Sequence, residues 1–161
     1  MTWNEELEDK YYRFFDVYEG EETERSYYKK GQILRGIECS EGWKKPVEQF
    51  LKTLEWIEDN YDYVNNPKFG IEEDEHIKIK GNKPVIKIFQ IKEKFGECRC
   101  YVTGNQNSQG AIDRAVAKLD AICSVTCERC GKLEEDCIRR SNGWIICVCK
   151  ECFDNLVLSR G

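Results

Sequence analysis

The chain contains a single histidine, His76, and no apolar run long enough to cross a membrane. A cysteine nucleophile usually works with a histidine base, and catalytic zinc sites usually include histidine ligands. The scarcity of histidine therefore argues against both kinds of centre. The sequence also lacks a Ser-His-Asp set, a P-loop and a GxGxxG motif. We therefore predict a non-enzymatic protein without a membrane-spanning helix.

An excess of basic residues is absent as well. The 161 residues include 25 lysines and arginines against 30 aspartates and glutamates, which gives a net charge of −5 and a pI near 5.2. Because phosphate binding usually needs a basic surface, nucleic-acid binding is disfavoured as the main role. The acidic segment 1–9 lacks the apolar core of a signal peptide, so a cytoplasmic location is expected.

Cysteine, by contrast, is abundant, with ten in the chain. Four of them form two CxxC pairs separated by eighteen residues, which is the ligand spacing of a zinc ribbon. Four thiolates around one ion leave no open position for water, so the predicted Zn²⁺ is structural rather than catalytic. Cysteines at metal spacing also favour a reducing compartment. The predicted ligands are Cys127, Cys130, Cys149 and Cys152.

The other six cysteines are expected to be free thiols, most of them small buried hydrophobic side chains. Two of them, Cys137 and Cys147, lie between the CxxC pairs. Cys147 is two residues before Cys149, and alternation along a strand places both side chains on the same side. An exchange of ligands at this position therefore stays open.

The apolar spacing predicts three helices, over residues 2–18, 43–60 and 108–122. Thr2 and Ser40 are candidate caps for the first two helices, and Pro46 suits an early helical turn. The first helix carries an aromatic stripe that is typical of a core-facing side.

Alternating apolar residues predict strands over 85–93 and 97–103, joined at Phe95-Gly96 into an antiparallel hairpin, after a shorter alternation at 77–79. This order of elements predicts an α+β fold, in which about three helices pack on a small antiparallel sheet. We divide the chain into an α+β domain at 1–123 and a C-terminal zinc ribbon at 124–161.

The hairpin region reverses the charge of the chain. From residue 76 to residue 101 there are seven basic and two acidic residues, a local charge of +5. In a regular strand Gln90, Lys92 and Lys94 share one face, with Arg99 and Tyr101 across the turn. Such a set can bind a phosphate or a nucleotide. The alternative is that the lysines protect an edge strand while Arg99 pairs with a surface carboxylate.

A second candidate segment, Gly36-Ile-Glu-Cys-Ser-Glu-Gly-Trp43, precedes the second helix. Its glycines permit a tight backbone, and Glu38 and Trp43 are candidates for the rim of a pocket. The alternative is the start of a helix with a packed tryptophan.

Three motifs resemble an uncharacterised family of bacterial and bacteriophage proteins. A GxECxxGW motif is matched at 36–43, a QxKEKFGxxRxY hairpin at 90–101, and a CxxCG, GW and CxxC series at 127–152. The resemblance spans roughly residues 11–153. It implies a phage or prophage origin, hence the cytoplasm of the host cell, and it implies no established activity.

Three functions are compatible with these observations. The first is a non-enzymatic phage-type protein that sequesters an anionic nucleotide-like signalling molecule, as an anti-defence sponge. The second is a zinc-ribbon adaptor or inhibitor that binds a host protein. The third, binding of nucleic acid by the ribbon, is disfavoured because its basic and acidic residues balance: Arg129, Lys132, Arg139, Arg140 and Lys150 against Glu128, Glu134, Glu135, Asp136 and Glu151.

Overall fold

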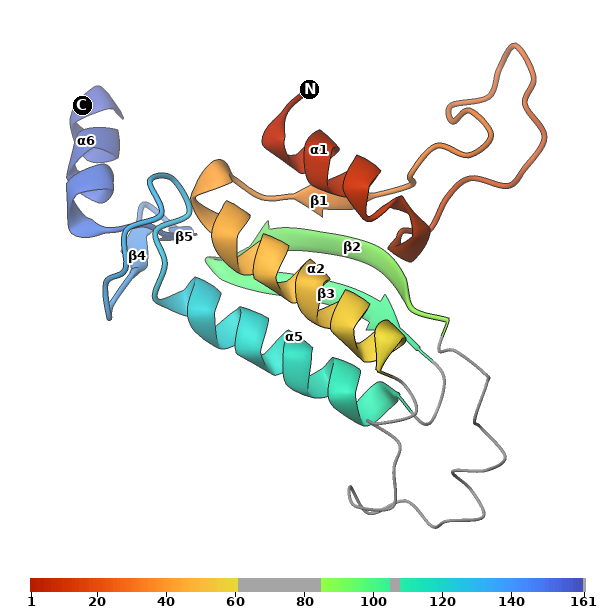
Figure 1. The fold of residues 1–161 in the computed structure, drawn as a ribbon. Coiled ribbons are helices and arrows are strands. Elements are labelled where there is room, and N and C mark those ends of the chain that lie inside the picture. Colours follow the sequence, from red (N-terminus) through yellow and green to blue (C-terminus); the bar gives the residue numbers. More distant parts are fainter. Residues whose placement is uncertain (61–84, 105–107, 161) are drawn as a thin grey trace.

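A computed structural model describes residues 1–60, 85–104 and 108–160. The fold consists of a three-stranded sheet with helices on one face and a two-stranded ribbon at one end (Figure 1). In chain order the elements are α1 (Trp3–Lys10), the 3-10 turn η1 (Tyr12–Phe14), β1 (Gly36–Glu38), the 3-10 turn η2 (Glu41–Trp43), α2 (Lys44–Asp59), β2 (Lys87–Lys94), β3 (Glu97–Thr103), α5 (Gln109–Ser124), β4 (Ile138–Ser141), β5 (Trp144–Cys147) and α6 (Lys150–Arg160).

The predicted α+β class is confirmed, and the two long helices lie within a few residues of their predicted positions. The first helix is shorter than predicted. It begins as expected, with Thr2 in a capping box, but α1 ends at Lys10. The α-helix does not continue through the aromatic residues that follow, because Phe15 forms a parallel bridge with Ile88 of β2. The Asp16 N–H donates to the Ile88 carbonyl at 3.0 Å. Ser40 makes no capping side-chain hydrogen bond.

The predicted hairpin of β2 and β3 is present. Its two-residue turn has positive φ at Phe95 (53°) and Gly96 (78°), the conformation that suits the twist of a tight hairpin. The sheet is mixed, however, and not wholly antiparallel as predicted, because β1 pairs with β2 in parallel. A parallel pair needs a crossover, and α2 lies on the connection between these strands. The predicted alternation at 77–79 lies outside the described residues.

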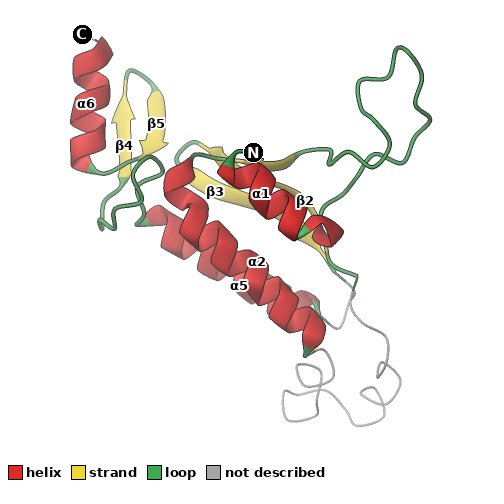
Figure 2. Cartoon of the chain, turned by 45° about the horizontal axis from the view of Figure 1, so that its top comes forward, coloured by secondary structure: helices red, strands yellow, loops and turns green. Residues whose placement is uncertain are grey.

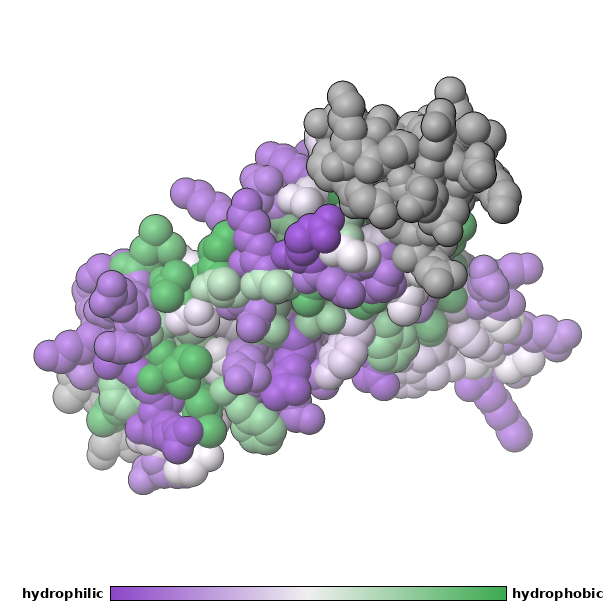
Figure 3. Space-filling view, turned by 90° about the horizontal axis from the view of Figure 1, so that it is seen from below, coloured by the Kyte–Doolittle hydropathy of each residue, from purple (hydrophilic) through white to green (hydrophobic). Residues whose placement is uncertain are grey.

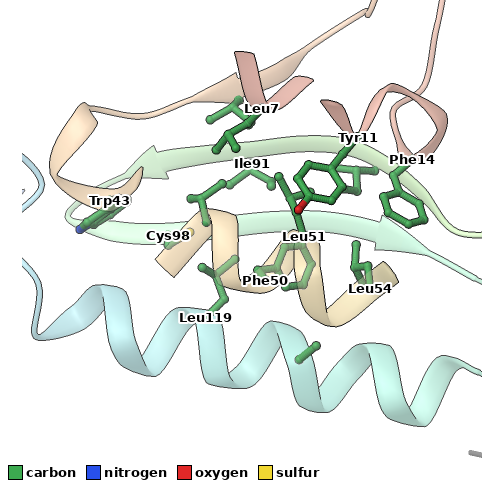
Figure 4. Packing of buried hydrophobic residues seen from close by; sticks show 14 of the residues in the cluster. Leu7, Tyr11, Phe14, Trp43, Phe50, Leu51, Leu54, Ile91, Cys98 and Leu119 are labelled. Atoms are coloured by element: carbon green, nitrogen blue, oxygen red, sulfur yellow. The ribbon is translucent and has the colours of Figure 1, made fainter. Parts of the chain in front are cut away.

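The main core lies between the sheet and the helix pair. Figure 4 shows side chains from α1, α2 and α5 meeting over β2 and β3. Leu51 and Leu54 from α2 and Ile112 from α5 are fully buried there, as is Ile91 on β2. Each fully buried aliphatic side chain contributes about 1.5–3 kcal/mol. Two ribbon cysteines, Cys137 and Cys147, belong to the same core, so the ribbon and the sheet share buried surface; the division at 123/124 stays a prediction.

The ribbon hairpin and α6 lie side by side at the end of the molecule (Figure 2). Apolar patches reach the surface at this end (Figure 3). The ribbon segment and α6 contribute several exposed large apolar side chains: Leu133, Ile138, Trp144 and Val157. Among the described residues, no helix has the length and apolarity needed to cross a membrane.

Candidate metal centre and outer sheet face

The four predicted metal ligands gather at one point. The Sγ atoms of Cys127, Cys130, Cys149 and Cys152 all lie within 4.8 Å of one another, and those of Cys130 and Cys149 are 3.7 Å apart. A tetrahedral zinc ion with Zn–S bonds of about 2.3 Å requires sulfur atoms about 3.8 Å apart. The first CxxC pair follows α5 and turns at Gly131 (φ 81°), and the second spans the start of α6. The geometry therefore fits a metal ion bound by four cysteines.

The surroundings of Cys127 favour its metal-binding form. Burial tends to raise the pKa of this thiol, but the backbone N–H groups of Cys130, Cys149 and Arg129 lower it to about 7. The Cys130 N–H lies 3.5 Å from the Cys127 Sγ. Since the thiolate is the form that binds a metal, these N–H groups prepare the site for an ion.

Cys147 does not join the four cysteines, so the open exchange of ligands finds no support in the geometry. Its Sγ is fully buried and donates toward the carbonyls of Cys123, at 3.3 Å, and Thr126, at 3.4 Å. Burial raises the pKa of this thiol to about 12, so it is protonated near neutral pH. Cys137 is likewise buried in the main core and outside the group of four.

The first CxxC turn is attached to the segment that precedes α2. The Gly42 N–H donates to the Glu128 carbonyl at 2.6 Å, and the Trp43 indole N–H donates to the Thr126 carbonyl at 2.8 Å. Trp43 was predicted as a candidate for the rim of a pocket, but its side chain is 0% exposed. The alternative, a packed tryptophan at the start of a helix, describes its position.

The hairpin turn also contacts the ribbon. A side chain at Gly96 would begin 3.3 Å from atoms of Ile145 and Ile146, so the turn lies directly on β5. Together with Gly42, this contact brings three separate sequence segments to one junction: the 36–43 segment, the hairpin turn and the cysteine ribbon. Packing at this junction therefore accounts in part for the sequence motifs of the three segments.

One feature of this junction could not be found from the sequence. Burial and the neighbouring Glu93 raise the pKa of Glu128 to about 7, and its carboxylate accepts from the Ser40 N–H at 3.4 Å. In sequence Glu128 is one of several charged residues of the ribbon. Its neighbours Ser40 and Glu93 are distant in sequence and come close only in the fold.

The predicted ligand residues of the hairpin do share a face. Gln90 lies opposite Tyr101, and Lys92 lies between Arg99 on β3 and Glu38 on β1. The neighbouring positions Ile37, Ile91 and Cys98 point into the core, so this outer sheet face is the side away from α2 and α5. Lys94, opposite Glu97, completes it. Trp43 is not part of it.

A β-bulge at Phe89 sets this arrangement. The register shifts between Ile88 and Gln90, so Ile88 and Ile91 both face the core although they are three residues apart. Gln90 therefore turns to the outer face, where it is 6% exposed, whereas Tyr101 beside it is 45% exposed.

The cations of the outer sheet face are partly neutralised. Arg99 Nη2 lies 3.1 Å from Glu97 Oε2, so the predicted alternative of a surface ion pair is present. The Arg99 Nε is buried without a hydrogen-bond partner. Within the described part of the chain, no ion pair involves Lys92 or Lys94. The lysines at 78, 80 and 83 of the basic run lie outside the described residues.

No protein-family model matches the chain, and no match was found among curated proteins or solved structures.

Proposed function

We propose that the protein binds a small anionic molecule that carries an aromatic ring, such as a nucleotide, on its outer sheet face. The register that places Lys92 opposite Arg99 and Gln90 opposite Tyr101 is the observation that supports this proposal. Two adjacent cations suit a phosphate, and the exposed ring of Tyr101 suits a base. Binding without conversion would make the protein a sponge for a nucleotide signal.

Each residue has a distinct role in this proposal. Arg99 offers a planar pair of N–H donors, and a phosphate competes with Glu97 for them. Lys92 supplies a second charge from the neighbouring strand, and Lys94 a third near the turn. Glu38, beside Lys92, repels a second phosphate at that edge and can accept from a ribose hydroxyl.

We further propose that the four cysteines hold zinc. Thiolates in a tetrahedral set favour Zn²⁺ over the oxygen-seeking Mg²⁺ and Ca²⁺. Native mass spectrometry of protein purified without added metal measures the ion directly. One zinc per chain supports the proposal, and another ion or none contradicts it.

Ligand binding is tested by calorimetry on the metal-loaded protein with nucleoside mono-, di- and triphosphates, cyclic nucleotides, ADP-ribose and inorganic phosphate. At least one ring-bearing compound of the panel should bind, and Arg99→Gln should lower the affinity for that compound by about tenfold or more. Arg114→Gln is the matched control, because Arg114 is exposed on α5, across the sheet. The proposal fails if no nucleotide binds, or if Arg99→Gln and Arg114→Gln bind it equally.

A further inference from the structure

A groove of about 730 Å³ lies between the first turns of α2 and the first CxxC turn, which we call the seam groove. It is distinct from the outer sheet face, because none of that face's residues lines it. One wall comes from the chain around the start of α2, and the other from the end of α5 and the ribbon. The lining includes Glu41, Lys44, Lys45, Arg129, Cys130 and Leu133.

The charge of the seam groove is opposite to that of the whole chain. Three cations, Lys44, Lys45 and Arg129, line it with one anion, Glu41, although the chain carries a net charge of −5. Over the described ranges, none of these cations forms a salt bridge. The first turn of α2 contains no acidic residue either, so the two lysines lie against the positive end of the helix dipole.

The groove also offers apolar contacts. Leu133 at its edge is 70% exposed, and Ile122 and Pro46 form aliphatic parts of the lining. No aromatic side chain lines the groove, so it lacks the stacking platform typical of a single-stranded nucleic-acid site. Just beyond Leu133 the chain continues with three acidic residues; Glu134 pairs with Arg139, and Glu135 and Asp136 repel a long polyanion at that end. A short acidic segment with an aliphatic residue fits better than an extended phosphate backbone.

We propose that the seam groove docks a short acidic peptide segment of a partner protein. Carboxylates of the segment pair with Lys44, Lys45 and Arg129, and an adjacent leucine-like side chain covers Leu133. Cys130, one of the four clustered cysteines, lies in the groove wall, so an ion bound there would hold the neighbouring Arg129 in that wall. This site is independent of the nucleotide proposal.

The test selects peptides from a random twelve-residue display library on the immobilised, metal-loaded protein. Peptides that combine carboxylates with an aliphatic residue should be enriched, and the affinity of the strongest is then measured by fluorescence anisotropy. A Lys44→Glu, Lys45→Glu double variant should weaken binding by about tenfold or more, because it reverses two of the three cations. The same change places acidic residues at the start of α2, where they favour the helix, so the unfolding midpoint should hold or rise.

The matched control is Arg114→Glu with Lys118→Glu, two exposed cations on α5 that lie outside the groove. It should bind the selected peptide as the unmodified protein does, as should Arg99→Gln. The proposal is overturned if acidic peptides are not enriched, or if the double variant binds as well as the control. It is also overturned if an oligonucleotide binds the groove more tightly than the peptide. If the protein self-associates and the double variant abolishes this self-association, the groove binds a second copy of the chain, and the peptide proposal is overturned.

Discussion

Replacing Gly42 by alanine should push the first CxxC turn away from the segment that precedes α2. A Cβ at this position would lie 2.1 Å from the Cys127 carbonyl oxygen and 2.2 Å from that of Glu128. Both atoms are backbone, so no side chain can turn aside to make room. The first CxxC turn has to move away by about 1 Å to restore an ordinary contact.

The cost follows from what this movement breaks. Overpacking in a well-packed region costs about 1–3 kcal/mol. The movement also weakens the hydrogen bonds from Gly42 to Glu128 and from the Trp43 indole to Thr126, at about 1 kcal/mol each. We expect Gly42→Ala to lower the free energy of unfolding by about 4 kcal/mol, which for a chain of this size lowers the unfolding midpoint by about 12 °C.

Denaturant and thermal unfolding of metal-loaded protein measure this change. Gly110→Ala is the matched control, because its Cβ meets only the end of the Arg114 side chain, at 3.6 Å, within helix α5. Glycine is a poor helix residue, so this control should gain about 0.5–1 kcal/mol. If Gly42→Ala unfolds within about 1 kcal/mol of the unmodified protein, the contact is not the tight junction inferred from the distances.

Three further predictions concern the metal, a buried acid and the indole. Cys152→Ala should lose the metal ion, whereas Cys147→Ala should keep one ion per chain. Metal analysis would contradict the proposed ligands if both variants retained the ion. Burial raises the pKa of the Glu8 carboxyl above its ordinary value of 4.5, so the ionised form destabilises the folded protein as pH rises. The amide of Glu8→Gln can still accept from the Ile37 N–H, so this variant should be more stable than the unmodified protein at about pH 7 but not near pH 4.5. Denaturant titrations at both pH values would show the difference. Trp43→Phe removes the indole donor and should cost about 2 kcal/mol of unfolding free energy, and a cost near zero would show that the hydrogen bond contributes little.

The helices and the hairpin were predictable because each is a local pattern. The apolar stripe of α2 and the turn at Phe95-Gly96 depend on neighbours in sequence. The end of α1 was not predictable in this way. Tyr11 and Phe14 continue a helical spacing, but Phe15 leaves the helix to bridge Ile88, which is 73 residues away in the sequence. The parallel pairing of β1 depends on the same kind of distant contact.

The gathering of the four cysteines was predictable for a similar reason, since two CxxC turns contain their own geometry. The sharing of one face by Gln90 and Lys92 was also predicted, although the bulge that maintains it was not. The seam groove had no sequence signal. Lys44 and Arg129 are 85 positions apart, and the packing of α2 against α5 together with the junction at Gly42 brings their segments together.

This junction connects the four-cysteine group to both candidate surfaces. The first CxxC turn forms a wall of the seam groove, and β5 supports the turn of the β2–β3 hairpin through Gly96. Binding of a structural zinc ion is worth about 10 kcal/mol or more in isolated ribbons, so an ion bound here would stabilise both supports. A chelator should therefore weaken peptide binding at the seam groove directly. It should affect the outer sheet face less, because the pairing of β2 with β3 does not require the ribbon.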